Sequence, residues 1–493
     1  MILNNLDNFD TSEFTIIGAG PASIILALEL EKKGKKVLII EAGSRYYDEK
    51  SQDFYKGKIV GDKYFDLHHC RLRFLGGGTG HYNGRLHPYD EIDFDIWPIK
   101  KKDLDPYFDE AKKIFEIKKK FRKSSSSIDN FYLASHIVSP IRFGEKYYDQ
   151  LSNSKNIFLI FNSPVQLIHE SQEFKNKVGS ISVIHNNLKK KLKVNKLILA
   201  CGGIENSRIL LWSSLNSKTN FLKNYPIGNY WMEHPSGNIG HFLGEKQKLN
   251  QLFKKDLESR NTYLVPNPEF IKKKKLNNSR IEFIFHEDIK ISDKSFQHYL
   301  KDLLCVAPEY GKKVIESIQK NRMLHCNSTI FIQSEMKPDF ENKIVLSKSK
   351  VDALGMPRIE LHWNVKDDFF DSSKVILSEL GNQFINFDIG RIGIDRYVFD
   401  KTLKNILTYK YKTPWSNLIR TYHTRNVFGG NHHMGGTRMS IHKKNGVVDS
   451  NLKVHEIDNF YIAGSSTFPS GGHWNPTFTI VQLSLRLAQH LSS

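Results

Sequence analysis

The amino-acid sequence predicts an α/β fold with a Rossmann-like dinucleotide-binding domain and a second domain beside it. A glycine-rich turn, GAGPAS at 18–23, stands between the apolar run FTII and a helical segment, and the run VLIIE, which ends in an acid, follows. The chain has 493 residues, and chains beyond roughly 250–300 residues usually divide into domains. We therefore expect two domains, one of them built on this motif.

The first segment, 14–43, has the pattern of a βαβ unit. Within its turn, Gly18 permits a tight bend, Gly20 lets the backbone approach a pyrophosphate at the helix N-terminus, and the small Ser23 allows the helix to pack closely on the strand. Glu41 ends the second strand, where a carboxylate accepts hydrogen bonds from a ribose. A glycine turn in an ordinary α/β protein is the alternative. The order of strand, helix, strand and acid argues against this alternative. The unit does not distinguish NAD from FAD, because both cofactors use it.

Three later segments extend this domain. FLGGGTGHYNGR at 74–85 has the composition of a loop whose backbone lies against a flat ligand. The stretch 97–115 predicts a turn that leads into an amphipathic helix, and 157–203 predicts short strands that return to the main sheet. Strands distant in sequence from 14–43 are thus predicted to join the same sheet.

The C-terminal segment completes the same domain. NFYIAGSSTFPS at 459–470 predicts a strand that ends in small residues. Residues 475–491 predict a helix, with Asn475 at the N-cap and Pro476 at the first helical position. The dinucleotide-binding domain is therefore predicted to be discontinuous in sequence.

The chain is strongly basic, with 72 Lys and Arg against 53 Asp and Glu and a formal net charge of +19. The excess lies in lysine runs such as those at 187–193 and 271–276. Such a field attracts an anionic membrane surface, an acidic partner or a nucleic acid. Lysines that decorate solvated loops are the plainer interpretation, and we adopt it. No nucleic-acid-binding module accompanies the runs, so we expect no nucleic-acid partner.

Cysteine spacing and the N-terminal residues indicate the compartment. The cysteines form no CxxC pair, so we expect no disulfide framework and no metal site; they are Cys70, Cys201, Cys305 and Cys326. The first residues lack a secretory signal, and the longest uncharged stretch, Phe460–Leu485, is broken by Gly, Pro, Ser and Asn. We expect a cytoplasmic protein without a membrane span, and export with a signal-bearing partner stays open.

A series of motifs runs in a fixed order through most of the chain: GAGPAS with EAG, GGGTGHYNGR, LACGGIENSRILLWSS, IGNYWMEHP, HHMGGTRMS, VVDSNLKVHEIDNFYIAGSSTFPS and NPTFTI. In content and order the series resembles the glucose-methanol-choline (GMC) oxidoreductases. It is most similar to the branch with pyranose oxidase and the large subunits of membrane-linked sugar and gluconate dehydrogenases. The resemblance implies FAD as the cofactor.

The resemblance also implies how the domains are arranged. A FAD-binding domain of the glutathione-reductase type would comprise residues 1–119, 157–240 and 426–493. An α+β substrate-binding domain with an antiparallel sheet over the flavin would comprise 241–425, with 120–156 as an insertion. The insertion and the region 240–335 match the family least. Because they would shape the substrate pocket, the sequence does not identify the substrate.

Two adjacent histidines in GGNHHMGGTRMS are candidates for a catalytic base, because a neutral imidazole accepts a proton near neutral pH. The family pattern His-x-Met/Leu-Gly places His432 first and His433 at the unspecified position, and the family's second residue falls on Asn475. The resemblance implies that His432 takes the hydroxyl proton of an alcohol, that hydride passes to flavin N5, and that Asn475 holds the substrate oxygen. The alternatives are a loop histidine that satisfies carbonyl groups and an asparagine that only caps its helix. We expect His433 to point away from the reaction.

Other positions are expected to contact or surround the cofactor. The resemblance implies that a backbone amide at Val165 meets the adenine and that the last helix directs its positive end at the flavin pyrimidine edge. Glu205 and Asn206 would serve packing and loop bonding, and His473 is a candidate pocket residue. The expected cofactor contacts are Gly18, Gly20, Ser23, Glu41, Gly77, Gly78, His81, Asn83, Val165, Gly464, Pro476 and Thr477.

His81 raises the question of a covalent bond to the flavin. In pyranose oxidase-like proteins a histidine in this loop carries such a bond, and GGGTGHYNG places His81 close to that position. Gly80 and Tyr82 depart from the pattern, and many relatives with a histidine here bind FAD without a bond. We therefore favour non-covalent FAD and leave the covalent alternative open.

Two functional hypotheses follow. The favoured one is an FAD-dependent oxidoreductase that oxidises an alcohol, with a sugar or polyol as the substrate class and oxygen or a carrier as the electron acceptor. The other is a flavin-containing member without net redox turnover, lyase-like, or a flavoprotein subunit of a larger electron-transfer complex. Association with a membrane surface or a partner subunit stays open. The sequence does not decide between oxidase and dehydrogenase, and it does not give the oligomeric state.

Overall fold

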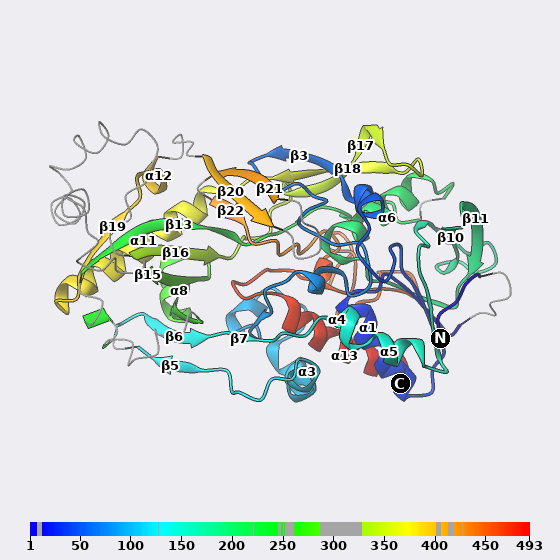
Figure 1. Ribbon diagram of the computed structural model, residues 1–493, viewed down its shortest axis with the longest axis horizontal. Helices are drawn as coiled ribbons and strands as arrows, with labels where there is room; N and C mark the ends of the chain where they lie inside the picture. Colours follow the sequence, from blue (N-terminus) through cyan, green and yellow to red (C-terminus); the bar gives the residue numbers. More distant parts are fainter. Residues whose placement is uncertain are drawn as a thin grey trace.

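The computed structural model describes residues 1–6, 12–126, 128–219, 221–244, 248–249, 251, 261–285, 328–400, 406–412, 419–425 and 427–493. One part of the molecule is built on a parallel sheet and the other on an antiparallel sheet, and the two lie side by side along the long axis (Figure 1). This arrangement confirms the predicted α/β class. Cys70 and Cys201 are free thiols, whereas Cys305 and Cys326 lie outside the described residues.

The parallel sheet has the strand order β23-β12-β1-β2-β8. β1 (Phe14–Ile17) lies between β2 (Val37–Ile40) and β12 (Lys196–Leu199), and β1 and β2 are buried throughout. Burial on both faces explains why these strands are continuous apolar runs. β8 (Ile157–Ile160) pairs with β2, and β23 (Phe460–Ile462) pairs with β12. A strand from the C-terminal segment therefore completes the sheet that the N-terminal segment begins.

Helices α1 (Pro21–Lys32) and α13 (Thr477–Ser492) pack against each other beside this sheet. α1 begins immediately after the glycine turn, as predicted for a βαβ unit. The predicted cap of the last helix is wrong, because Pro476 occupies the N-cap of α13. The side-chain oxygen of Asn475 accepts a hydrogen bond from Arg280 instead.

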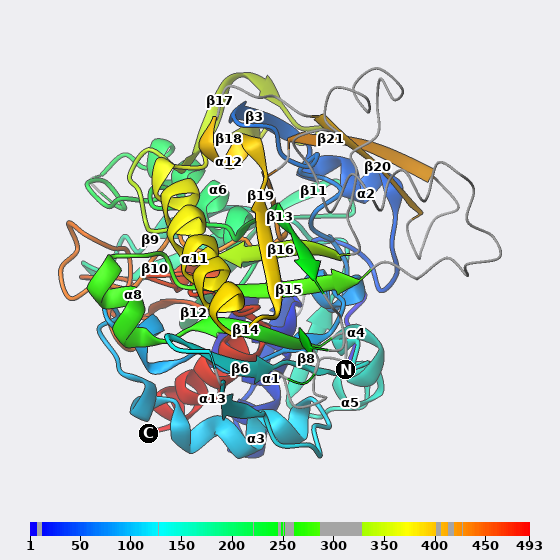
Figure 2. The ribbon, with the colours of Figure 1, turned by 90° about the vertical axis from the view of Figure 1, so that its left-hand side faces the viewer.

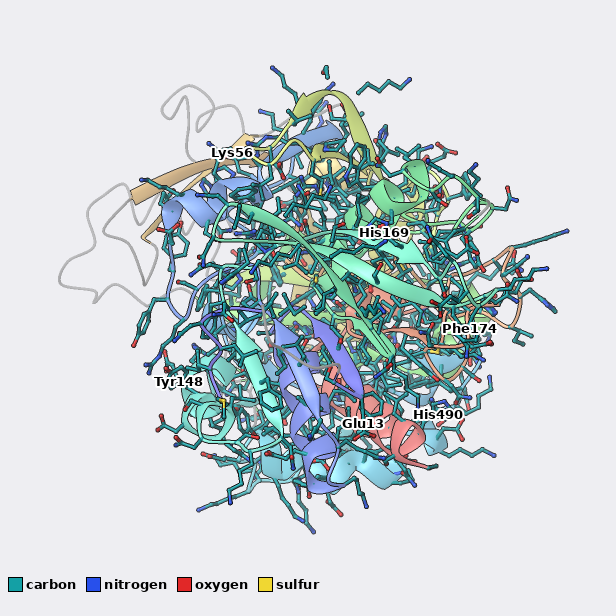
Figure 3. All side chains as sticks on the ribbon, turned by 90° about the vertical axis from the view of Figure 1, so that its right-hand side faces the viewer. Glu13, Lys56, Tyr148, His169, Phe174 and His490 are labelled. Atoms are coloured by element: carbon teal, nitrogen blue, oxygen red, sulfur yellow. The ribbon has the colours of Figure 1, made fainter. Side chains whose placement is uncertain are left out.

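A small antiparallel sheet lies next to the parallel one; its strands are β9 (Val165–Glu170), β10 (Val178–His185) and β11 (Leu188–Lys193). Figure 3 shows this side of the molecule, with His169 of β9 labelled. β11 is an edge strand and carries the exposed Lys189, Lys191 and Lys193. Charged side chains on an edge strand oppose pairing with other chains, so this lysine run has a structural explanation.

The larger antiparallel sheet dominates the other part of the molecule. Its strands are, in spatial order, β19 (Gly390–Ile394), β13 (Pro235–Gly244), β16 (Ser328–Ser334), β15 (Ser279–Phe285), β14 (Thr262–Pro266), β6 (Phe131–Ser135) and β5 (Lys123–Ser125), with β22 (Val427–Gly429) on β13. α11 (Asp367–Asn386) crosses one face of this sheet (Figure 2). Its buried Phe369, Ile376, Leu380 and Phe384 share one helix face, which is the pattern of a helix that packs on a core.

The remaining elements connect these parts. β3 (Gly57–Gly61), β17 (Lys343–Val351) and β18 (Pro357–Trp363) form a further sheet, and two short pairs join β4 (Arg85–Leu86) to β7 (Ile137–Val138) and β20 (Ile406–Lys412) to β21 (Ile419–Arg425). The other helices are α2 (Glu49–Gln52), α3 (Phe108–Ile114), α4 (Phe143–Lys146), α5 (Tyr148–Ser152), α6 (Gly202–Leu215), α8 (Pro268–Lys274) and α12 (Arg396–Phe399). The turn and helix predicted over 97–115 are present, as 3-10 turns around Pro106 that precede α3. Within the part of the chain that is described, no helix is long and apolar enough to cross a membrane.

Candidate active site

The motifs singled out in the sequence line one cavity of about 590 Å³. Its lining includes the glycine turn and the start of β9, here called the nucleotide end, and the histidine doublet and the start of α13, here called the catalytic end. The loop 74–83 and the start of α6 also line it, and Gly203 of α6 lies against the backbone of His433. Every expected site residue except Ser23 and the candidate pocket residue His473 contributes to this wall. Ser23 is fully buried in α1, where its small side chain permits close packing.

The nucleotide end of the cavity is a backbone cradle with one carboxylate. Gly18 has φ +95°, and a Cβ there would lie 2.7 Å from the carbonyl oxygen of Ala200, so the turn requires glycine. At Gly20 a Cβ would meet nothing within 4 Å, because the turn faces the cavity at the N-terminus of α1. This open turn fits a pyrophosphate group.

Glu41 is fixed by the backbone of the same cradle. Its Oε2 accepts a hydrogen bond from the Ala19 amide at 2.8 Å, and its Oε1 accepts one from the Gly43 amide at 2.7 Å. Each carboxylate oxygen can accept a second hydrogen bond, so Glu41 can still bind the hydroxyl groups of a ribose. Burial raises the pKa of Glu41, and the two amides oppose this shift.

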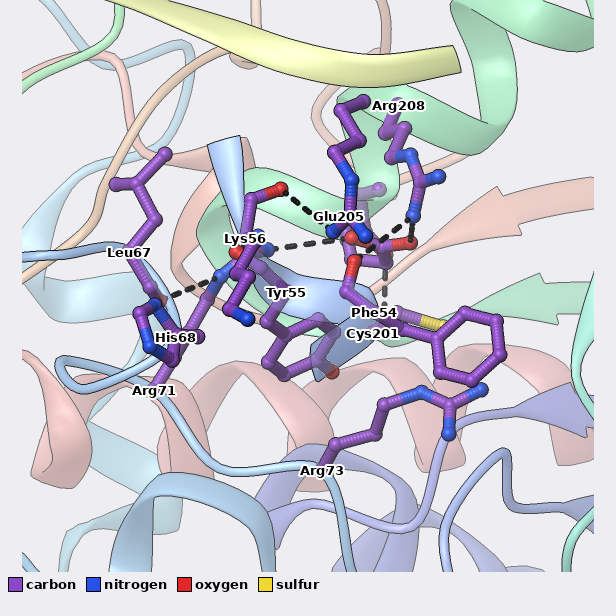
Figure 4. Close-up of polar contacts among 12 residues, drawn as sticks. Phe54, Tyr55, Lys56, Leu67, His68, Arg71, Arg73, Cys201, Glu205 and Arg208 are labelled. Atoms are coloured by element: carbon purple, nitrogen blue, oxygen red, sulfur yellow. Dashed lines mark hydrogen bonds and ion pairs between the residues drawn. The ribbon is translucent and has the colours of Figure 1, made fainter. Parts of the chain in front are cut away.

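A group of paired charges forms the wall beside the cradle (Figure 4). Arg208 contacts Glu205 at 3.0 Å and Asp352 at 2.6 Å, and Arg71 contacts Glu205 at 3.2 Å. These arginines hold the pKa of Glu205 below its ordinary value against the effect of burial. Glu205, which we expected to serve packing, therefore ties the loop before the 74–83 segment to α6. Asn206 also bonds locally, since its Oδ1 accepts from the Cys201 amide at 2.7 Å.

At the other end of the cavity, His432 belongs to a chain of hydrogen bonds. Its Nδ1 lies 2.9 Å from Nδ1 of His234, and Nε2 of His234 lies 3.1 Å from the carbonyl oxygen of Gly471. The side-chain nitrogen of Gln333 lies 3.1 Å from the same Nδ1 of His234. His234, which directly precedes β13, is thus the partner of His432, and β16 and the loop before α13 supply the partners of His234.

These contacts determine which ring nitrogens carry protons. The carbonyl of Gly471 can only accept, so Nε2 of His234 is protonated and Nδ1 of a neutral His234 is an acceptor. His432 must then donate from Nδ1, which leaves its Nε2 unprotonated. Burial, and next the proximity of His234, lower the pKa of His432 well below its ordinary value. Burial likewise lowers the pKa of His234 to about 3. His432 is therefore a neutral imidazole whose Nε2 can accept a proton.

His433 also lines the cavity, and its ring hydrogen-bonds to Tyr64, which does not line the cavity. Its Nε2 lies 3.1 Å from the hydroxyl of Tyr64, and Tyr64 donates to the buried carboxylate of Glu233. Glu233 accepts from the backbone amide of His432 at 2.8 Å and from that of His234, also at 2.8 Å. Burial raises the pKa of Glu233 to about 7. His433 and Glu233 thus anchor the loop that carries His432.

Asn475 lines the cavity opposite this loop. The guanidinium of Arg280 has only donors, so the Asn475 atom that it contacts at 3.0 Å is the amide oxygen. The NH₂ group of Asn475 remains as a donor that makes no hydrogen bond to the described residues. His473 is buried and contributes no atom to the cavity wall, and its carbonyl oxygen accepts from Arg280 and Gln333.

His81 lies on the wall of the same cavity. Burial, with the nearby Arg142, lowers its pKa to about 4, so the ring is neutral. Among the described residues, no three His, Cys, Asp or Glu side chains gather as ligands for a metal ion.

Sequence reasoning missed the residues that orient the two candidate catalytic side chains. His234 and Glu233 lie in the motif IGNYWMEHP, which was recognised without a chemical role. Arg280 and Gln333 lie on strands of the region that matches the family least, and no local pattern distinguishes them. Arg208 lies inside the recognised motif at 199–214 and Arg71 shortly before the loop 74–83, but only the fold shows their shared partner Glu205.

Two comparisons of the sequence with known proteins give matches to oxidoreductases. The model of the GMC oxidoreductase family matches residues 338–484. The fructose dehydrogenase large subunit of Gluconobacter japonicus is 32% identical over 178 residues, which are 36% of this chain and 27% of that protein. The match therefore spans only about a quarter of this curated relative.

Solved structures resemble the whole chain in fold. Pyridoxine 4-oxidase from Mesorbium loti has a TM-score of 0.60 and 13% identity, with 98% of this chain and 99% of that chain covered. An FAD-dependent oxidoreductase from Chaetomium thermophilum has a TM-score of 0.58 and 14% identity, with 97% and 98% covered. Formate oxidase has a TM-score of 0.56 and 12% identity, with 99% of both chains covered.

Proposed function

We propose that this chain, which belongs to the GMC oxidoreductase family, is an FAD-dependent enzyme that oxidises an alcohol, with a sugar or polyol as the substrate class. The observation that carries the proposal is the tautomer of His432. An unprotonated Nε2 in the same cavity as a dinucleotide cradle is the arrangement that alcohol oxidation requires. The name of the fructose dehydrogenase relative supports a sugar-like substrate.

Several residues of the nucleotide end would hold the cofactor. Gly18 and Gly20 would accommodate the pyrophosphate at the start of α1, Glu41 would accept from the ribose, and Val165 would meet the adenine. The other expected contacts are Gly77, Gly78, His81, Asn83, Gly464, Pro476 and Thr477. When bound, FAD supplies a two-electron acceptor for the hydride of the alcohol carbon.

The residues at the other end would prepare the alcohol. Asn475 would donate from its NH₂ group to the substrate oxygen, and His432 would accept the hydroxyl proton at Nε2. The Nδ1–H of His432 would keep its hydrogen bond to His234, so the imidazolium that forms would retain an acceptor. His432 would hold the proton until the carbonyl product leaves.

The test is anaerobic mixing of the purified flavoprotein with a panel of sugars, polyols and simple alcohols. Bleaching of the flavin absorbance by a member of the panel is the expected result. If no alcohol or sugar bleaches the flavin, the lyase-like or electron-transfer alternative replaces the proposal. Reoxidation of the reduced protein with oxygen, and separately with a carrier dye, then distinguishes an oxidase from a dehydrogenase.

We further propose that the FAD is bound without a covalent bond. His81 lines the cavity, but its neighbours Gly80 and Tyr82 differ from the residues that accompany a covalent link. Acid denaturation followed by filtration should release all of the yellow colour into the filtrate. Colour that stays with the polypeptide in the wild type, and is lost from His81→Ala, would establish a bond through His81.

A further inference from the structure

Arg280 is a buried guanidinium without a carboxylate partner. It lies on β15 with 5% of its surface exposed, and none of the described acids is within ion-pair distance of it. Its Nη1 donates to the carbonyl oxygen of His473 at 3.1 Å, and its Nη2 donates to Oδ1 of Asn475 at 3.0 Å. A buried charge that is not neutralised destabilises a fold, so its presence beside the cavity calls for a functional explanation.

Aromatic rings take the place that a carboxylate usually occupies. The guanidinium carbon lies 4.8 Å from the ring centroid of Tyr263 and 5.2 Å from that of Trp474. Cation–π contacts stabilise a guanidinium without cancelling its charge. Arg71 and Arg208, by contrast, lie against the carboxylates of Glu205 and Asp352. Arg280 therefore keeps a net positive charge one side chain away from the cavity.

The first consequence concerns the orientation of Asn475. A terminal amide can turn over and exchange its oxygen and nitrogen at little cost in shape. Arg280 permits only one orientation, because its donors require the amide oxygen. The NH₂ group is then directed to the cavity side, where it can donate to an oxygen atom of a ligand but cannot accept from one.

The second consequence concerns charge. The carboxylates that line the cavity are Glu41, Glu205 and Asp352. Glu205 and Asp352 are paired with Arg71 and Arg208, and none of the three is within ion-pair distance of Arg280. His432 and His433 are neutral because burial keeps the pKa of each low. Glu282 and Arg85 interact electrostatically with Arg280, but neither lines the cavity, and Glu282 is not within ion-pair distance of Arg280. The charge of Arg280 is therefore not neutralised by an ion pair with a described residue.

We propose that Arg280 is the positioning residue of Asn475 and the source of a positive potential at this end of the cavity, so that the site accepts neutral or anionic hydroxy compounds and rejects cationic amino alcohols. The choice of substrate charge rests on the proposed function. The potential itself does not, because it acts on any anion that enters the cavity.

Sulfite tests the potential without a substrate. It adds through its sulfur lone pair to N5 of an oxidised flavin, leaves negative charge on the ring and bleaches the absorbance, so its Kd reports a nearby positive charge. Arg280→Met in the FAD-loaded protein should weaken sulfite binding at least about tenfold, which corresponds to about 1.4 kcal/mol. Arg280→Lys, which keeps the charge, should stay within about threefold of the wild type. Lys443→Gln, which removes an exposed lysine charge paired with Glu456, is the matched control and should change nothing.

Arg280→Gln extends this test if Arg280→Met does not fold with FAD. Gln and Lys both donate hydrogen bonds and differ in charge, so equal sulfite affinities of Arg280→Gln and Arg280→Lys would overturn the potential. An unchanged Kd in Arg280→Met would overturn it as well. If no alcohol bleaches the flavin while the sulfite result holds, the proposed function fails and the potential stands.

A double-mutant cycle tests the positioning. Asn475→Ala should slow flavin reduction by alcohol and leave the sulfite Kd within about threefold. In the Asn475→Ala background, Arg280→Gln should lose part of its effect on alcohol reduction, because the amide that Arg280 orients is gone. Fully additive effects on reduction would contradict the positioning role. Faster reduction by an amino alcohol than by the matching neutral polyol and its carboxylate analogue would contradict the substrate class.

Discussion

The two ends of the cavity are built on opposite electrostatic principles. At the nucleotide end, Arg71 and Arg208 are neutralised by Glu205 and Asp352, and Glu41 is held by backbone amides. At the catalytic end, His432 and His234 are neutral, and the guanidinium of Arg280 has no carboxylate within ion-pair distance among the described residues.

The difference corresponds to two different tasks. A binding site is preorganised when its polar groups already have ion-pair or hydrogen-bond partners, because these groups then stay in place whether or not a ligand is bound. A site that moves protons and hydride needs groups whose charge can change or whose field is not cancelled. The predictions below test this contrast, from the largest expected effect to the smallest.

Replacement of the base should have the largest effect. His432→Ala removes the proposed base, so flavin reduction by alcohol should slow by roughly a hundred- to ten-thousandfold. Stopped-flow absorbance under anaerobic conditions measures the rate. His433→Ala, which removes the bond to Tyr64, should cost much less. The reverse order of the two effects would transfer the base role to His433.

Loss of a paired charge at the nucleotide end should affect stability rather than chemistry. Arg208→Met leaves Glu205 without one of its two arginines and Asp352 without its partner, at a position where the Arg208 side chain is 3% exposed. The free energy of unfolding should fall by roughly 3–5 kcal/mol. Arg280→Met breaks no ion pair and should cost clearly less. Urea unfolding followed by tryptophan fluorescence compares the two, and equal losses would remove the contrast between the two ends.

Replacement of His234, which fixes the tautomer of His432, should have the next largest effect. His234→Ala leaves Nδ1 of His432 without its acceptor, so the proton can sit on either ring nitrogen. Flavin reduction should slow by roughly ten- to a hundredfold. Loss of a partner that orients a metal-bound histidine has an effect of this size. His234→Asn offers a side-chain oxygen to the same Nδ1–H and should recover part of the rate. Identical rates for the two variants would show that His234 serves only packing.

The free energy of unfolding should fall as the pH is lowered from neutral, because of the buried histidines at the catalytic end. His234 and His433 have folded-state pKa values of about 3 and an ordinary value of 6.5, so the unfolded chain binds their protons first as pH falls. Their contribution to stability is complete above pH 6.5 and is lost between pH 6.5 and about 3, by up to about 1.4 kcal/mol per group and pH unit. Glu233 acts in the opposite sense, because its pKa is raised to about 7 and its contribution disappears as pH rises through that value. Urea titrations over this range should show a shallower acid slope in His433→Phe than in the wild type.

The exposed ion pairs should contribute least. Lys443→Ala breaks a pair with Glu456 in which both side chains are about half exposed. The free energy of unfolding should change by less than about 1 kcal/mol. A larger loss in the same urea experiment would mean that exposed charges also support the fold and that the contrast is not confined to the cavity.

Local sequence determined the nucleotide end to a large extent. The βαβ unit is contiguous, and Gly18 and Glu41 owe their roles to the turn and to the strand end that they occupy. Because these constraints act over a few residues, a periodic pattern and a few glycines predict them. The catalytic doublet was also found in sequence, but the resemblance to a family, rather than local physics, separated His432 from His433.

Only the tertiary structure decided how the catalytic end works. The tautomer of His432 depends on His234, Gln333 and the carbonyl of Gly471, and the orientation of Asn475 depends on Arg280, which lies 195 positions away in the chain. Asn475 was predicted as a helix cap because cap signals are local, and the fold gave its oxygen to Arg280 instead. Sequence patterns determine which elements form, because backbone hydrogen bonds and helix or strand periodicity are short-range. The protonation and orientation of a side chain depend on whichever donors and acceptors the packed sheets bring next to it, and that juxtaposition is a property of the fold alone.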